Sequence, residues 1–219
     1  MNLPNLSRAI LITRPSHDRI TTYLFFWSEQ VINQAIKSRV KVLDLSKQKA
    51  TRVNFISYNN RHNPKLVFLN GHGDKNSIAG HHDETILEVG DEQELFGKIV
   101  YARSCEVINN FGQISVSKGT KAFIGYQAKF FLAMSGSTGS KPKQDKVAKR
   151  FLEPSNLIVN ALLKGNPVGI AYQRSQAAMH KNIIAMLSTN ASQLERDSAQ
   201  YLWANRTNQK VIGDLSATI

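Results

Sequence analysis

Short apolar runs alternate with longer amphipathic or polar stretches along most of the chain. Each run has the length of a buried strand, about four to eight residues. The stretches between the runs repeat apolar residues at helical spacing, as in Tyr23, Trp27 and Val31. This alternation predicts an α/β fold with a mostly parallel six-stranded sheet and helices on both faces. Strands are predicted at residues 9–14, 40–45, 65–70, 98–104, 121–126 and 210–214.

Helices are predicted between and after these strands. One long helix is expected to follow the first strand, capped by Asp18. A later one should be broken at Pro154 and restart at Ser155, because proline lacks an N–H and serine caps well. The predicted helices cover residues 19–38, 50–60, 107–119, 145–163, 167–187 and 192–205.

Two of the predicted strands stop at chemically capable residues. The first ends in Gly71-His72-Gly73, where the glycines allow a sharp turn and a close approach to a ligand. The second ends at Cys105, the single cysteine of the chain. In a parallel sheet both residues emerge at the carboxyl edge, where such folds bind ligands. A thiol beside an imidazole is the minimal equipment for acyl transfer through a thioester. The simpler interpretation is a buried small hydrophobe and a turn histidine.

Two polar stretches are interpreted as loops. Residues 74–90 are rich in turn formers and are expected to form a functional loop with a small hairpin. Residues 133–144 are dense in Ser, Gly, Lys and Pro. We expect this second stretch to be a mobile loop or a cleavable linker near the cleft.

Composition sets broad limits on the class of protein. The chain has 219 residues, of which 42% are hydrophobic, as in an ordinary globular protein. A single cysteine excludes an internal disulfide and favours a reducing compartment. The apolar run at residues 9–12 is too short for a signal peptide, and no stretch approaches the roughly 20 apolar residues that cross a membrane. The sequence therefore predicts a soluble cytoplasmic protein without a membrane span.

The net charge of +12 is concentrated in the second half of the chain. Residues 1–97 carry 12 Lys/Arg and 10 Asp/Glu, whereas residues 98–219 carry 16 and 6. A basic surface can attract nucleic acid, anionic membranes or acidic proteins. No RNA- or DNA-binding signature accompanies the charge, so a solvated basic surface is the simpler interpretation and nucleic acid stays open as a partner.

Other motifs predict less. One polar loop carries five candidate metal ligands, His72, Asp74, His81, His82 and Asp83. Their spacing matches no compact zinc signature. The Ser- and Gly-rich run at residues 135–141 lacks the glycine spacing of a phosphate-binding loop, and no Gly-x-Ser-x-Gly elbow occurs. We therefore predict no metal and no cofactor.

The pair of strand ends resembles that of the caspase-like cysteine peptidases: one strand ending in His-Gly, then another ending in a small residue and Cys. This clan includes caspases, metacaspases, gingipains, clostripain-like enzymes and CHAT-domain proteases. The runs Ile99–Ala102, Phe123–Tyr126 and Val211–Asp214 look most similar to the gingipain-like and CHAT branches. The chain departs from the local caspase pentapeptide, because the residues around the cysteine are Arg-Ser-Cys-Glu-Val.

The resemblance implies a three-layer caspase-like fold, with one peptidase domain over residues 1–219. It also implies a cysteine endopeptidase that acts on a protein or peptide through a thioester acyl-enzyme. Cys105 would be the nucleophile and His72 the group that protonates the leaving amine. The backbone N–H groups of Gly73 and Cys105 would form the oxyanion hole.

Arg103 is predicted to help set the substrate specificity, because strand alternation places its side chain on the same side of the strand as that of Cys105. A guanidinium in the pocket predicts Asp or Glu at P1, the substrate residue before the scissile bond. Alternatively, Arg103 pairs with Glu106 or Asp74 and leaves an apolar or small pocket. The further residues expected to bind substrate are Ser104, Asp74, Tyr126, Gln127, Lys129 and Asp18.

A second function remains open at this point. The chain could be a catalytically inactive caspase-like module that binds a protein partner or nucleic acid through its basic C-terminal half. A regulatory protein partner is a further option for either function.

Overall fold

The computed structural model of the chain describes residues 8–136 and 141–219. Its centre is a six-stranded sheet with the strand order β2-β1-β3-β6-β7-β8. Strands β2, β1, β3, β6 and β7 run parallel, and β8 pairs antiparallel with β7. The predicted mostly parallel six-stranded sheet is confirmed. The strands are β1 (Ala9–Arg14), β2 (Lys41–Ser46), β3 (Leu66–Asn70), β6 (Ile99–Arg103), β7 (Ala122–Tyr126) and β8 (Gln209–Gly213).

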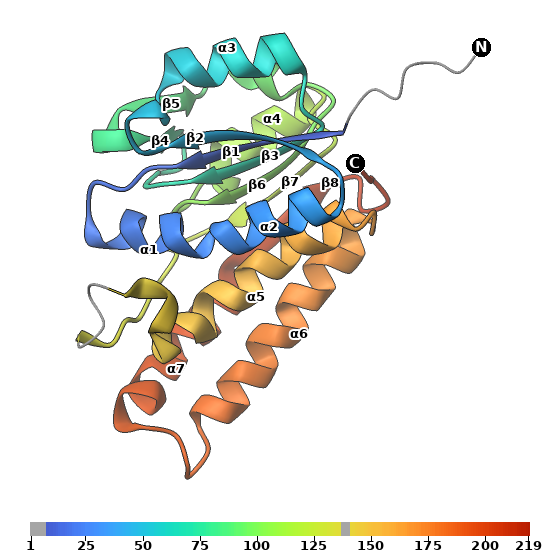
Figure 1. The fold of residues 1–219 in the computed structure, drawn as a ribbon. Coiled ribbons are helices and arrows are strands. Elements are labelled where there is room, and N and C mark those ends of the chain that lie inside the picture. The colour runs from blue at the N-terminus through green and yellow to red at the C-terminus, as the bar shows by residue number, and fades with distance from the viewer. Residues whose placement is uncertain (1–7, 137–140) are drawn as a thin grey trace.

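Helices cover both faces of this sheet, which makes a three-layer α/β fold (Figure 1). They are α1 (Arg19–Trp27), α2 (Glu29–Lys37), α3 (Arg52–His62), α4 (Gln113–Ser117), α5 (Lys146–Leu163), α6 (Val168–Met186) and α7 (Gln193–Asn208). One face is covered by α3, α4 and an antiparallel hairpin of β4 (Ser77–Ala79) and β5 (Thr85–Glu88). The other face is covered by α1, α2 and α5, and α6 and α7 pack against α5. None of the described helices has both the length and the apolar character that a membrane crossing requires.

The central strands are apolar on both sides. Ile10 and Ile12 of β1 contribute to the core beneath α2 and α5, whereas Leu11 contributes to the core beneath α3. All three side chains are buried. Because successive residues of a strand face opposite sides, a strand covered on both faces needs a continuous apolar run. This explains why uninterrupted apolar runs in the sequence correspond to the strands.

The long helix predicted at residues 19–38 is divided into α1 and α2 at Ser28. The Ser28 hydroxyl donates to the backbone carbonyl of Leu24 at 2.6 Å and accepts from Arg103 at 2.7 Å. A serine that bonds back to the preceding turn competes with the helical hydrogen-bond ladder and bends helices. The break therefore carries a buried polar group toward the end of β6.

The predicted interruption at Pro154 is wrong, because α5 continues through it. Proline leaves the carbonyl four residues earlier without its helical donor, here the carbonyl of Arg150. The side-chain amide of Asn182 on α6 donates to that carbonyl at 2.8 Å. A tertiary contact thus replaces the missing hydrogen bond. The predicted second start at Ser155 is not needed.

The helix predicted at residues 107–119 is also irregular. It begins as a π-turn at Ile108–Gly112 and becomes α-helical only in α4. The backbone N–H of Phe111 donates to the carbonyl of Lys75 at 2.9 Å, in the loop after β3. This bond takes one amide out of the helical ladder and ties the segment after β6 to the segment after β3.

The segment predicted to be a mobile loop or linker, residues 133–144, lies partly outside the described residues. Its described ends are anchored. The indole N–H of Trp27 donates to the carbonyl of Pro142 at 3.0 Å, and Pro142 is buried. The backbone N–H of Ser135 donates to Asp145 at 2.8 Å. Mobility and cleavage of this segment stay predictions.

Candidate active site

The carboxyl ends of β3 and β6 form the candidate site. These strands are parallel neighbours, and their last residues, Asn70 and Arg103, are paired in register. The loops that follow therefore leave the same edge of the sheet side by side. One loop carries His72 and the other carries Cys105, as the strand-end argument predicts.

Ser104 joins the two loops. Its hydroxyl donates to the carbonyl of Gly71 at 3.1 Å, and its side chain is buried. A Cβ atom at Gly73 would lie 3.0 Å from the Ser104 Cβ, closer than real Cβ atoms usually approach. The two loops are therefore in direct contact at the positions that flank the histidine and precede the cysteine.

The Gly-His-Gly turn requires both of its glycines. Gly71 has a φ of +152°, and a Cβ there would lie 2.1 Å from the carbonyl oxygen of Ala79. A Cβ at Gly73 would lie 2.8 Å from the carbonyl oxygen of Ser77. The backbone N–H of Ala79 donates to the carbonyl of His72 at 2.9 Å. Strand β4 thus presses against the turn and fixes the backbone that carries His72.

His72 and Cys105 line the same pocket, which has a volume of about 220 Å³. Its walls combine apolar side chains from α1 and from the segment after β7 with the two strand-end loops. The pocket is lined by Ile20, Leu24, Gly71, His72, Arg103, Ser104, Cys105, Lys129, Phe130 and Phe131. Two cations and no carboxylate are among these residues.

Cys105 follows the end of β6 and is half-buried. The backbone N–H of Phe130 is directed at its sulfur at 3.4 Å, which orients the thiol toward the segment after β7. The next residue, Glu106, has a φ of +58°, a left-handed conformation that costs a non-glycine residue about 1–2 kcal/mol. Backbone strain of this kind concentrates at functional sites.

The two backbone N–H groups predicted to form an oxyanion hole belong to Gly73 and Cys105. Within the described residues, neither the N–H of Gly73 nor that of Cys105 makes a hydrogen bond to the protein. The backbone groups of their neighbours Asp74 and Glu106 are both engaged, with the carbonyls of Ser77 and Ala128. N–H groups without a partner near a thiol can donate hydrogen bonds to a substrate carbonyl oxygen and stabilise the negative charge that develops on it.

Asp18 contacts His72 directly. The separation between His72 Nε2 and Asp18 Oδ2 is 2.5 Å, and the His72 side chain is 42% exposed. The Asp18 carboxylate also accepts from the backbone N–H of Thr21 at 2.7 Å, which caps α1. Partial burial by itself would raise the pKa of Asp18. The hydrogen bonds from His72 and Thr21 outweigh burial and lower this pKa below its usual value. Asp18 is thus placed to orient the histidine.

Arg103 lies at the floor of the pocket and is fully buried. It donates to Asn70 Oδ1 at 2.6 Å, to Asn156 Oδ1 at 3.0 Å and to Ser28 Oγ at 2.7 Å. All three acceptors are neutral, and among the described residues Arg103 has no carboxylate partner. Pairing with Glu106 or Asp74, the alternative from the sequence, does not occur. Burial lowers the pKa of Arg103 to about 10, so the side chain is charged at neutral pH.

Besides Asp18, which contacts His72, three residues predicted to bind substrate lie outside this pocket. The exposed carboxylate of Asp74 instead accepts from the backbone N–H groups of Asn76 and Ser77, at 2.7 and 2.9 Å, and shapes its own turn. Tyr126 is buried in the core, where its hydroxyl bonds with Tyr101 and Gln209. It is therefore not accessible to a substrate.

Gln127 is the third such residue. It is exposed, and its backbone pairs with Asn208 and with the Asn109 side chain. By contrast, Lys129 and Ser104 do line the pocket, as predicted.

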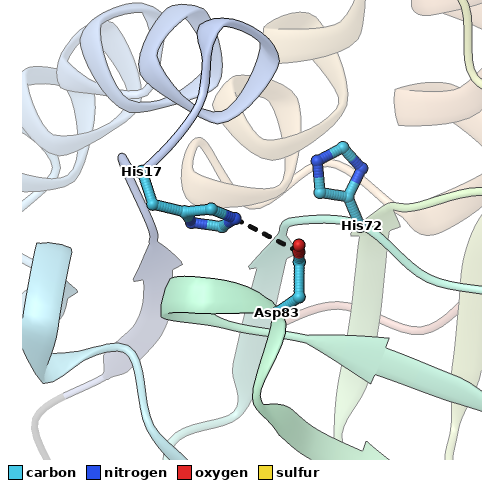
Figure 2. A group of neighbouring side chains, drawn as sticks. All are labelled: His17, His72 and Asp83. Atoms are coloured by element: carbon cyan, nitrogen blue, oxygen red, sulfur yellow. Dashed lines mark hydrogen bonds and ion pairs between the residues drawn. The ribbon is translucent and has the colours of Figure 1, made fainter.

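Sequence reasoning missed His17, whereas it named Asp83 as one of five candidate metal ligands whose spacing matches no compact zinc signature. His17 follows β1, and Asp83 lies in the link between β4 and β5. The His17 Nε2 atom lies 3.1 Å from Asp83 Oδ1 (Figure 2). A signal for His17 existed, because β1 is the parallel neighbour of β3 and its carboxyl end must lie at the same edge.

A larger cavity of about 500 Å³ lies between α6 and α7, away from the strand ends. It contains neither Cys105 nor His72 and has no candidate nucleophile. Its lining residues are Ile183, Leu187, Arg196, Asp197, Ala199, Gln200 and Trp203. The smaller pocket at the sheet edge is therefore the better candidate for chemistry.

No family model and no curated protein matches the sequence. Among solved structures, the fold is similar to that of the Arg-specific cysteine proteinase gingipain R (RgpB). That match has a TM-score of 0.63 at 12% identity and covers 97% of this chain and 47% of that one. A complex of the Porphyromonas gingivalis RgpB pro- and mature domains matches with a TM-score of 0.60 at 14% identity, over 97% and 48% of the two chains.

The chain thus spans about half the length of these solved proteins. At such identities the similarity concerns the fold. Together with the strand order and the two covered faces, it shows that this chain has the caspase-like fold of the gingipain cysteine proteinases.

Proposed function

We propose that this protein is a cysteine endopeptidase with Cys105 as nucleophile and His72 as its acid/base partner. The observation that supports this most strongly is the shared pocket. Both side chains line it, and the N–H groups of Cys105 and of Gly73, the residue after His72, have no partner among the described residues. Nucleophile, proton carrier and oxyanion donors are the groups that acyl transfer from an amide requires.

The reaction proceeds in two halves. The Cys105 thiol gives its proton to His72 as the sulfur attacks the scissile carbonyl carbon, and the carbonyl oxygen takes up negative charge facing the N–H groups of Gly73 and Cys105. The C–N bond then breaks as His72 gives a proton to the leaving amine, which leaves a thioester. Water attacks the thioester while His72 accepts its proton. The C–S bond then breaks, and His72 returns the proton to the Cys105 sulfur, which releases the acid product and the free thiol.

Asp18 positions His72 in this proposal. A hydrogen bond from Nε2 to a carboxylate places the ring proton on Nε2 and leaves Nδ1 as the nitrogen available to the cleft. Asp18 is itself held by the start of α1. The orientation of the imidazole is thus linked to the fold rather than to a flexible side chain.

We further propose that the pocket favours an acidic P1 residue. Arg103 lies at its floor and the exposed Lys129 at its rim, with apolar walls from Ile20 and Phe130 between them. A carboxylate entering this space meets positive charge in a partly desolvated environment. A basic P1 side chain would meet repulsion instead. One solved relative is described as Arg-specific, so the two pockets should differ in the sign of the preferred charge.

A peptide library with each residue at P1 tests both parts of the proposal. We expect cleavage after Asp or Glu, lost in Cys105→Ala and lowered about 10²–10⁴-fold in His72→Ala. Since Cys105 is the single cysteine, an acidic peptidyl electrophile should form one adduct. A folded protein that neither cleaves nor labels would contradict the enzyme assignment and favour the non-catalytic binding module. Cleavage after Arg or Lys would contradict the acidic preference alone.

A regulatory polypeptide at this cleft is a related proposal. One solved relative was determined as a complex of its pro- and mature domains. The basic pocket here would favour an acidic segment in that role.

A further inference from the structure

Four of the six histidines of the chain, His17, His72, His81 and His82, form one cluster around His17, and His72 is the candidate catalytic histidine. The ring centroid of His17 lies 6.1 Å from that of His72, 5.3 Å from that of His81 and 5.7 Å from that of His82. The carboxylates of Asp18 and Asp83 lie in the same cluster. This concentration of imidazoles and carboxylates is more than a Cys-His peptidase needs.

Three of these side chains have the spacing of metal ligands. One nitrogen each of His17 and His72 and one oxygen of Asp83 all lie within 4.8 Å of one another. Figure 2 shows His17 and Asp83 pointing toward each other, with the His72 ring beside them. The His17 Nε2 atom lies 3.1 Å from Asp83 Oδ1 and 3.7 Å from Asp18 Oδ2. Ligands of a tetrahedral ion with bonds of about 2.0 Å are about 3.3 Å apart. Small side-chain rotations would therefore suffice.

The backbone that carries these groups comes from three separate elements. His17 follows β1, His72 follows β3, and Asp83 lies between β4 and β5. The His17 side chain is 7% exposed and held in place, whereas that of Asp83 is 60% exposed and leaves an entry path. His82 and Asp83 have φ values of +55° and +60°. Two successive left-handed residues aim the carboxylate at His17, and such strain is typical of ligand-binding turns.

We propose that His17, His72 and Asp83 bind a divalent transition-metal ion of the zinc class, with the Asp18 carboxylate as fourth ligand. Two imidazoles with carboxylates suit zinc and its neighbours, whereas calcium and magnesium prefer oxygen ligands alone. A metal on His72 prevents it from carrying protons. A metal bound here therefore inhibits the enzyme. This inhibition rests on the proposed function, whereas metal binding does not depend on it.

Binding of Co²⁺ as a spectroscopic probe, with Zn²⁺ as competitor, tests the site independently of catalysis. The titrations use Cys105→Ser protein, so that the thiol cannot supply a ligand. We expect a tetrahedral Co²⁺ spectrum that Zn²⁺ abolishes. Even an outer-shell partner of a metal ligand is worth about 10–100-fold in affinity. His17→Gln and Asp83→Asn, each added to the Cys105→Ser protein, should weaken binding at least that much.

His180→Gln, in the same background, is the matched control. His180 is exposed on α6, outside the cluster, so its loss should leave the affinity unchanged. Because Asp83 is exposed, Asp83→Asn should fold even if His17→Gln does not. Unchanged affinity in Asp83→Asn, or binding that needs Cys105, would overturn the inference.

Inhibition is measured separately on the protein with its cysteine. Zn²⁺ should inhibit cleavage, and a chelator should restore it. The inhibition constant of Asp83→Asn should be at least tenfold higher than that of the parent, with the inhibition of each protein measured against its own rate without Zn²⁺. If no peptide is cleaved by any form, the proposed function fails while the Co²⁺ titration still decides the metal site. Inhibition that is equal in both proteins would contradict the regulatory role.

Discussion

Two arginines end strands of the same sheet at the same edge, and their surroundings differ in one respect. Arg14 ends β1 and Arg103 ends β6, and both are largely buried. Each guanidinium also lies over an aromatic ring, at 4.3 Å from the Phe25 centroid and 4.7 Å from the Phe68 centroid. Arg14 forms a bidentate pair with the carboxylate of Asp44, with bonds of 2.8 and 2.5 Å. Arg103, by contrast, bonds only to neutral oxygens within residues 8–136 and 141–219.

The fold neutralises the charge of Arg14 and leaves that of Arg103 without a carboxylate partner among the described residues. A buried charge is costly unless it is paired, and Arg14 is paired within the chain. Arg103 keeps its charge beneath the pocket that contains the thiol. An anionic substrate group can supply the counter-charge that the protein omits. The acidic P1 preference that we propose rests on this missing carboxylate.

The largest expected effect comes from removing the unpaired charge. In Arg103→Met, the ratio of kcat/KM for Asp over Ala at P1 should fall by about 30-fold or more, because losing one partner of a buried charge pair costs about 2–5 kcal/mol. Stability should fall as well, because the acceptors on Asn70, Asn156 and Ser28 lose their donor, although removal of the unpaired buried charge offsets part of this cost. Paired P1 substrates and a thermal melt measure the two quantities. An unchanged ratio in a folded variant would contradict the role of Arg103.

Asp44→Asn makes the surroundings of Arg14 resemble those of Arg103. Breaking a fully buried pair costs about 3–5 kcal/mol, and the 29% exposure of the Asp44 side chain reduces this to about 1–3 kcal/mol. The P1 ratio should stay at the parental value, because Arg14 does not line the pocket. Denaturant unfolding and the same substrate pair provide the test. A shift in the P1 ratio would show that charge anywhere along this edge sets specificity.

Asn156→Asp places a carboxylate beside Arg103, so that its surroundings resemble those of Arg14. Asn156 Oδ1 already accepts from Arg103 at 3.0 Å, so a carboxylate there would give the guanidinium an internal counter-charge. The Asp-over-Ala ratio should fall about tenfold, less than in Arg103→Met, because the cation stays in place. The variant also loses the amide donors to Trp27 and Gln30, so its melting temperature should drop. A ratio that stays constant would contradict the idea that lack of a partner creates the preference.

The sequence predicted the strands and the two strand-end loops because both depend on local information. A strand covered on both faces must be a continuous apolar run, and the His72 turn needs glycine where β4 presses against it. The parallel pairing of β3 with β6 then brings the loops that carry His72 and Cys105 to the same edge of the sheet, and no additional sequence signal is needed. These features are properties of short segments combined with one topological rule.

The rest depends on contacts between distant parts of the chain. Arg103 meets Ser28 and Asn156, which lie 75 and 53 positions away, so its neutral partners could not be predicted from strand alternation. The continuity of α5 through Pro154 depends on Asn182 of another helix. Tertiary contacts of this kind override local propensity.

The smallest expected effect concerns a third arginine, Arg52, whose side chain in its ion pair is more exposed than that of Arg14. Arg52 Nη2 lies 2.5 Å from Asp91 Oδ1, the Arg52 side chain is 39% exposed, and the pair ties α3 to the segment after β5. Exposed pairs contribute little, so Asp91→Asn should cost about 0.5–1 kcal/mol at pH 7. The exposed Glu153→Gln on α5 is the control and should cost less.

The dependence on pH separates this pair from simple packing. The hydrogen bond from Arg52 outweighs partial burial and lowers the pKa of Asp91 below its usual value. A carboxylate with a lower pKa in the folded state contributes stability above its unfolded pKa of about 3.9, and loses it as the pH falls through the folded value. The stability difference between parent and Asp91→Asn, measured by urea unfolding, should therefore shrink from pH 7 to pH 3. A difference that stays constant over this range would mean that the side chain acts through packing and not through its charge.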